Sequence, residues 1–293
     1  MIAMLTLFSG AGSLIASTMQ SCADVKIEKT IFSSYDISIT NTITQSDADK
    51  IAQRATEFGI NALRMTLTDS SGGDVDAAIQ IGRIIRENDA TVYVDGKCYS
   101  SCALIYIAGV TRINSGVIGL HRPYFGSTPQ SRQSVERQLP LMLQKVKSYV
   151  QEMGVADNFY QEMINTEPSK MKLYEGGNIQ KIVPTLDPTY DEIKTSYEAL
   201  KYGIDTQEMR QRILDSDKIC SENRNNGLSC DEAVKFGLSE RVFEQRVKTI
   251  QKRCDLSNEE NNTLFVLTKW KDRRDHPLWI KWMTCRRNII LGR

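Results

Sequence analysis

Histidine is the scarcest chemically active side chain of this sequence, because His121 and His276 are the only two among 293 residues. So few histidines exclude a metal cage built from them, and the cysteine spacings match no zinc site. An excess of either charge is also missing, since 37 basic residues stand against 36 acidic ones. This balance favours no nucleic-acid partner. The sequence therefore predicts no metal, no cofactor and no nucleic acid.

Charged side chains are absent from the first sixteen positions, yet this run is shorter than the about 20 apolar residues that cross a bilayer. It suits a secretory signal, because small residues at Ser21 and Ala23 fit a cleavage site before Asp24. No Lys or Arg lies near Met1, so an uncleaved anchor and a buried N-terminal helix stay open. We expect a signal peptide or N-terminal anchor over residues 1–23, and an exported, periplasmic or membrane-associated protein.

The cysteine count is compatible with export. Removal of Cys22 with a signal leaves six cysteines, which can pair in fifteen ways in an oxidising compartment. They are Cys98, Cys102, Cys220, Cys230, Cys254 and Cys285. Cys98 and Cys102 would point the same way if both were helical, so a disulfide there is open. Two buried thiols that fill a small-residue helix are the interpretation we favour.

Strand and helix patterns alternate in the first half of the chain. Apolar spacing predicts edge strands over 25–40, a helix over 46–58, strands over 61–66, 91–94 and 118–120, and helices over 75–87 and 98–107. This order is typical of an α/β fold with a parallel sheet. A chain of this length buries one sizeable core, so we expect one main domain with an appendage.

The second half has helical periodicity. Residues 130–153 predict a helix that Pro140 kinks or interrupts. Segments 191–204 and 225–238 resemble each other, which indicates a duplicated helix or an insertion rather than a solenoid. The tail from Phe265 holds all three tryptophans and many basic residues. It suits an anionic membrane surface or a partner groove, although we favour a terminal helix docked on the core.

Three short segments carry residue types that catalysis uses. Gly73 ends a paired-glycine turn, where backbone N–H groups can hold an oxyanion. Ser100 lies between a strand and an apolar helix, and His121 follows a strand, where it can accept a proton. Each has an ordinary structural explanation as a turn, an N-cap or a strand-end histidine. Their order and spacing together favour a site.

These segments, SSGGDV, GKCYSSCALIYIAG and VIGLHRP, resemble the proteolytic subunit of Clp protease and exported bacterial relatives with the ClpP/crotonase fold. The clear match covers residues 61–124, with a further fit at SCDEAVKFGLSERV. The resemblance implies a ClpP/crotonase-like spiral of ββα units over residues 24–243, with a helical insertion at about 125–220. Residues 244–293 would form a basic, Trp-containing C-terminal extension.

The resemblance also implies an exported serine hydrolase, most directly a peptidase acting on peptides or proteins, and a homo-oligomer. Ser100 would be the nucleophile and His121 the general base, while Gly73 and Ser101 would donate backbone N–H groups to the oxyanion. Two other chemistries fit less well. An acyl-CoA enzyme of the crotonase type has only Asp74 beside the glycine turn, and a lysine base would have to be Lys97.

The third member of a catalytic triad departs from the family. Where the family has an aspartate before a leucine-serine helix start, this chain has Asn225. Asp191 holds the equivalent place in the earlier copy, and Asn225 is the alternative, because an amide can also orient an imidazole. A site with no third residue stays open. The same departure favours a second hypothesis, a catalytically inactive binding or assembly module in the cell envelope.

Overall fold

The computed structural model describes residues 24–29, 35–55, 63–126, 131–221, 227–254, 257, 260 and 276–293. The predicted signal segment, the alternative triad residue Asn225 and Trp270 lie outside the described residues. Within those ranges, every helix is too short or too polar to pass through a bilayer.

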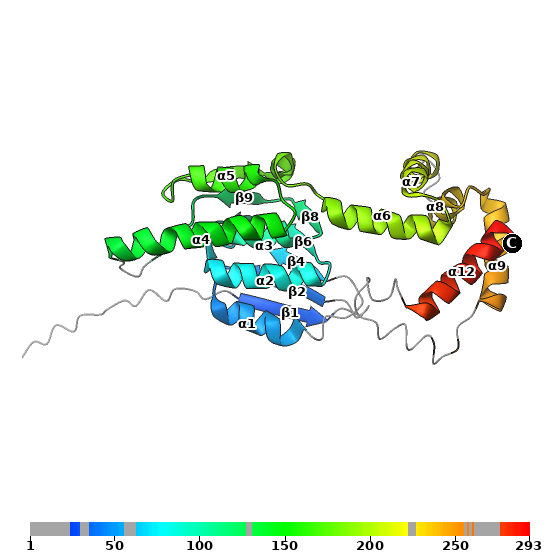
Figure 1. Cartoon of the computed structure of the whole chain (residues 1–293), viewed down its shortest axis with the longest axis horizontal. Coiled ribbons are helices and arrows are strands. Elements are labelled where there is room, and N and C mark those ends of the chain that lie inside the picture. The colour runs from blue at the N-terminus through cyan, green and yellow to red at the C-terminus, as the bar shows by residue number, and fades with distance from the viewer. Residues whose placement is uncertain are drawn as a thin grey trace, which may run out of the picture.

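A five-stranded sheet forms the centre of the described α/β part, with the strand order β1-β2-β4-β6-β8 (Figure 1). Four of its strands run parallel, and β1 pairs with β2 antiparallel at one edge. The predicted α/β class with a parallel sheet is therefore confirmed. The strands are β1 Asp24–Lys29, β2 Tyr35–Thr40, β4 Arg64–Leu67, β6 Thr91–Val94 and β8 Thr111–Asn114.

Shorter sheets hold the turns between these strands. β3 Thr42–Ile43 pairs with β5 Gly72–Gly73, while β9 Val117–Leu120 lies between β7 Lys97–Tyr99 and β10 Lys172–Glu175. The prediction of a helix over 98–107 is wrong at its start. Helix α3 spans Cys102–Ala108, because Cys98 and Tyr99 pair with β9 as part of a strand.

Helices of this part cover the sheet and close its core. They are α1 Gln45–Arg54, α2 Val75–Glu87, α4 Arg132–Glu152, α5 Asp157–Asn165 and the 3₁₀ helix η2 Gly176–Lys181. Helix α4 continues through Pro140, so an interruption at this proline is ruled out. Its buried residues, Val146, Tyr149 and Val150, all lie in its C-terminal half. We call residues 24–186 the α/β body.

A second hydrophobic core lies in the helices that follow, which we call the helical arm (Figure 1). In Figure 1, α6 leads away from the sheet toward the other helices of the arm. The predicted boundary at 243–244 is wrong, because it falls inside α9, which packs with α8 and α12. The arm helices are α6 Pro188–Tyr202, α7 Thr206–Cys220, α8 Gly227–Lys235, α9 Glu240–Arg253 and α12 Pro277–Leu291.

The two similar segments form corresponding helix ends, as the duplicated-helix interpretation predicts. Helix α6 ends at Gly203 with φ 71°, and Gly237 after α8 has φ 68°. Both values lie in the left-handed region, which glycine adopts without steric cost. The rings of Tyr202 and Phe236, equivalent in the two copies, pack with centroids 4.3 Å apart. The copies therefore bury each other's aromatic positions.

The C-terminal helix α12 docks on the arm. The Trp279 ring stacks on Tyr197 at 6.2 Å, and Trp282 packs against the arm core. The Arg246 side chain of α9 donates to the Ile290 carbonyl near the end of α12. The described part of the tail thus fits the docked terminal helix that we favoured. Contact of the tail with a membrane surface stays a prediction.

A buried charged cluster joins the body to the arm. Asp187 caps α6 by accepting from Tyr190 N at 2.9 Å, and its Oδ2 lies 3.1 Å from Arg86 and 3.3 Å from Arg112. Arg112 is completely buried and also donates to the carbonyls of Ile107, Pro184 and Met153. Burial and the neighbouring Arg86 lower the pKa of Arg112 to about 10, which leaves it charged at neutral pH.

Candidate active site

A cavity of about 910 Å³ opens between the strand ends of the body and helix α4. Gly73, Ser100 and His121 all line it, so the structure brings three of the predicted site residues to one space. Across the cavity, α4 contributes Leu141 and Lys145. Polar and apolar side chains both line the walls.

The backbone of Ser100 has an unusual conformation. Its φ is 57°, and the other non-glycine residues with positive φ in the described part are Asn41, Asp69 and Asp89. Asparagine and aspartate tolerate this left-handed region because their short side chains bond locally, whereas serine has no such advantage. Ser100 N donates to the Gly119 carbonyl at 2.9 Å, which fixes the turn between β7 and α3. Such outliers gather at functional sites.

The paired glycines lie directly against this serine. A Cβ on Gly72 would lie 2.7 Å from Ser100 Cβ and 3.0 Å from Ser101 N, so only glycine permits this approach. Gly73 follows on the cavity wall. Ser101 is 2% exposed, and its backbone N–H has no hydrogen-bond partner among the described residues. The geometry therefore leaves the Ser101 N–H next to Ser100, with no acceptor among the described residues.

His121 is held in one tautomer by the main chain. Its Nδ1 lies 2.9 Å from the Arg122 carbonyl oxygen, and the imidazole is 6% exposed. A carbonyl oxygen only accepts hydrogen bonds, so Nδ1 is the donor in this contact, and in the neutral imidazole Nε2 is then the acceptor. The imidazole is thereby prepared to accept a proton at Nε2. Within the described part of the chain, no hydrogen bond joins His121 to Ser100 Oγ.

Asp191, the predicted third residue, does not reach His121. It lies in α6 of the arm, and its carboxylate pairs with Arg210 at 2.9 Å. The Arg122 carbonyl takes the place beside Nδ1 that an aspartate holds in a triad. The sequence offered no signal for this partner, because every residue has a carbonyl oxygen and only the backbone path selects one.

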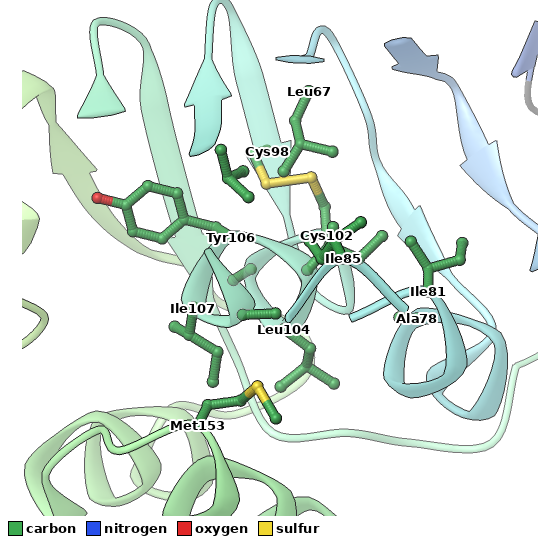
Figure 2. Close-up of a cluster of buried hydrophobic side chains, with 14 of the residues drawn as sticks. Leu67, Ala78, Ile81, Ile85, Cys98, Cys102, Leu104, Tyr106, Ile107 and Met153 are labelled. Carbon is green, nitrogen blue, oxygen red and sulfur yellow. A yellow bond between two sulfur atoms is a disulfide. The ribbon is translucent and has the colours of Figure 1, made fainter. Parts of the chain in front are cut away.

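The cysteines that flank Ser100 form a disulfide, so the preference for two free thiols was wrong (Figure 2). Cys98 belongs to β7 and Cys102 begins α3, and the turn between them brings their Cα atoms to 5.2 Å. This separation is within the range that disulfides span. The other described cysteines pair as Cys220–Cys230 and Cys254–Cys285, both inside the arm.

The residues of the other two chemistries differ in their relation to the cavity. Asp74 caps α2, because its Oδ1 accepts from Asp76 N at 2.7 Å and from Ala77 N at 3.0 Å. Lys97 is exposed on β7 and does not line the cavity. Asp74 lines the cavity together with Ser100, but its Oδ1 is engaged in this cap.

Neither a protein-family model nor a curated protein matches this chain. Fold and site define an α/β protein in which a serine with a left-handed backbone shares a cavity with a tautomer-fixed histidine.

Proposed function

We propose that this chain is an exported serine hydrolase, most directly a peptidase of the ClpP/crotonase-like type. The observation that carries the proposal is the left-handed backbone of Ser100, with φ 57°. Ser100 lies at a strand-to-helix turn and lines the cavity that His121 also lines. In α/β-hydrolases, the nucleophilic serine occupies such a strained turn between a strand and a helix, because the turn exposes Oγ to the substrate. The parallel sheet and the order of the three motifs support the ClpP/crotonase-like spiral.

In the proposed mechanism, Ser100 Oγ attacks the acyl carbon of the substrate while His121 Nε2 takes the hydroxyl proton. The carbonyl oxygen becomes an oxyanion, which accepts hydrogen bonds from the backbone N–H groups of Gly73 and Ser101. His121 then returns the proton to the leaving group, and an acyl-serine remains. Water hydrolyses this ester with His121 again acting as the base.

The Arg122 carbonyl would keep the imidazole oriented through both steps. As a neutral acceptor, it stabilises the imidazolium less than a carboxylate would. We therefore expect a slower enzyme than one with a complete triad. Export is supported by the disulfides of the described residues, since such bonds persist in oxidising compartments. A peptide or protein substrate and a homo-oligomer belong to the same proposal, by resemblance.

A catalytically inactive binding or assembly module in the cell envelope is the second candidate. Two observations favour it: no described carboxylate contacts the imidazole, and Ser100 Oγ has no hydrogen bond to His121. The same cavity would then hold a peptide without cleaving it. Catalytic hydrogen bonds often tighten only when substrate binds, so the free geometry is compatible with both candidates.

Labelling with a fluorophosphonate, which reacts with activated serines, separates the two. We expect the purified chain to be labelled, and Ser100→Ala and His121→Ala to lose labelling by about 10³-fold or more. Ser101→Ala is the matched control and should keep labelling, because the main chain supplies its hydrogen bond. Asp191→Ala should keep it too. A folded wild-type protein that takes up no label would favour the binding module.

A further inference from the structure

The Cys98–Cys102 disulfide closes a ring of five consecutive residues with Ser100 at its centre. One sulfur is attached to strand β7 and the other to the first residue of α3, so the bond ties together the two elements that the turn connects. No other described disulfide lies in the body. The bond therefore acts on the turn itself rather than on a distant part of the chain.

The disulfide rests on a rigid base. Both cysteines are completely buried, and Figure 2 shows the bond among Leu67, Ile85 and neighbouring core side chains. Core side chains are close-packed, so they resist displacement of the sulfurs. The turn is thus held from the core side, while Ser100 faces the cavity on the other side.

Side-chain hydrogen bonds do not hold the turn. Ser101 Oγ is buried without a partner, and no hydrogen bond of Ser100 Oγ to a described residue is present. The backbone is held by Ser100 N to Gly119 O at 2.9 Å and by Ala103 N to Ser100 O at 3.0 Å. A left-handed serine persists only where its surroundings over-determine it. The covalent bond between its two flanks supplies the additional constraint.

We infer that the Cys98–Cys102 disulfide is a positioning device for Ser100, which keeps its backbone in the left-handed conformation that aims Oγ into the cavity. The inference rests on the proposed function in one respect only, that the positioned atom is a nucleophile. Cys98 and Cys102 do not touch the substrate. Their effect should appear in the reactivity of Ser100 rather than in substrate binding.

The first experiment compares Cys98→Ala/Cys102→Ala with the wild type by fluorophosphonate labelling, separated into binding and inactivation steps. We expect the inactivation rate to fall by about 10²-fold, since small misplacements of a reacting atom have effects of this size, with apparent binding nearly unchanged. Cys220→Ala/Cys230→Ala is the matched control, because it removes a short disulfide of the arm. Its labelling rate should stay within about twofold of the wild type.

Equal labelling by the wild type and the Cys98 variant would overturn the inference, and so would an equal fall in the control. If the double alanine variant does not fold, Cys98→Val/Cys102→Ala keeps more of the buried volume and serves instead.

The second experiment needs no enzymatic activity, so it separates failure of this inference from failure of the proposed function. Ser100→Gly relieves the cost of the left-handed backbone and should raise Tm by about 2–4 °C in the disulfide-bonded protein. Without the disulfide the turn can relax, so Ser100→Gly should then raise Tm by less than half as much. An equal gain with and without the disulfide would show that the bond does not hold the turn.

Discussion

The α/β body and the helical arm join their elements by different means. In the body, hydrogen bonds between strands connect distant segments, and the main core lies against them. Helices bond within themselves, and the described residues of the arm form no such ladders. The core of the arm is also the smaller of the two. Two disulfides and a charged cluster connect its helices instead. The part of the molecule with the smaller apolar core, the arm, is thus the part that covalent and ionic links hold together.

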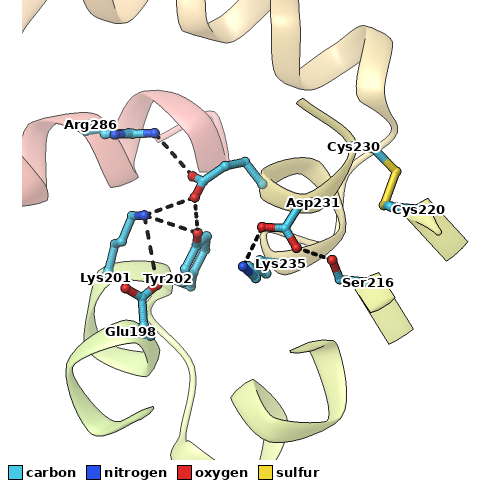
Figure 3. A network of polar contacts seen from close by, with 10 residues as sticks. Glu198, Lys201, Tyr202, Ser216, Cys220, Cys230, Asp231, Lys235 and Arg286 are labelled. Carbon is cyan, nitrogen blue, oxygen red and sulfur yellow. Dashed lines mark hydrogen bonds and ion pairs between the residues drawn. A yellow bond between two sulfur atoms is a disulfide. The ribbon is translucent and has the colours of Figure 1, made fainter. Parts of the chain in front are cut away.

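The charged cluster of the arm centres on Glu232 (Figure 3). Its carboxylate accepts from Tyr202 Oη at 2.7 Å, Lys201 Nζ at 3.1 Å and Arg286 at 3.2 Å. In Figure 3, Lys201 and Tyr202 come from α6 and Arg286 comes from α12. One carboxylate therefore connects α6, α8 and α12, the three arm helices that end in a left-handed glycine.

The largest expected effect is at the junction of the two parts. Asp187→Ala leaves Arg86 and the buried Arg112 without their carboxylate and removes the cap of α6. We expect a loss of about 3–5 kcal/mol in the free energy of unfolding, the usual effect of breaking a buried ion pair. Urea denaturation measures it. Asp191→Ala, which breaks an exposed pair with Arg210, is the control and should lose at most about 1 kcal/mol. Similar losses for both would contradict the prediction.

The arm disulfides come next in size. The Cys254–Cys285 bond spans a sequence separation of 31 and the Cys220–Cys230 bond one of 10, so their removal should cost about 4 and about 3 kcal/mol respectively. Double alanine variants and thermal unfolding test this order. We expect the arm to unfold first while the sheet of the body persists. If circular dichroism and tryptophan fluorescence showed both parts unfolding in a single step, this division would be contradicted.

At neutral pH, two buried tyrosines give the smallest effect and sharpen the comparison. The Tyr106 hydroxyl in the body is buried without a partner, whereas Tyr202 in the arm donates to Glu232. At neutral pH, Tyr106→Phe should be neutral or slightly stabilising, and Tyr202→Phe should lose about 1 kcal/mol. Matching losses in chemical denaturation would show that the Tyr106 hydroxyl does have a stabilising partner.

The buried hydroxyl of Tyr106 also predicts a pH dependence of stability. Burial raises the pKa of Tyr106 from 10.0 to about 12, so the unfolded chain loses this proton first as the pH rises. The contribution of this raised pKa to the free energy of unfolding is complete below pH 10. It is lost between pH 10 and 12, by about 2–3 kcal/mol. Tyr106→Phe should flatten the stability profile in that window, relative to wild type. An unchanged profile would assign the alkaline loss to other groups.

Much of the body was predictable from local patterns. Alternating burial in β2, the helix after Gly73 and the strand before His121 follow from side-chain periodicity and from the turn glycines. The start of α3 was not, because Cys98 and Tyr99 are in a strand only through pairing with β9. The domain boundary was missed for a similar reason. Periodicity shows that α9 is helical and does not show which core it joins.

For the site, the sequence by itself determined the residue types and their order: paired glycines, a serine before an apolar helix, and a histidine after a strand. Only the tertiary structure decided that these residues share a cavity, and that Ser100 has a left-handed backbone. It also paired six cysteines in one of fifteen ways and gave the Arg122 carbonyl to His121 in place of Asp191. The physical reason is that local motifs depend on residues close together in the sequence. The contacts of the site instead depend on where distant backbone segments meet in the fold.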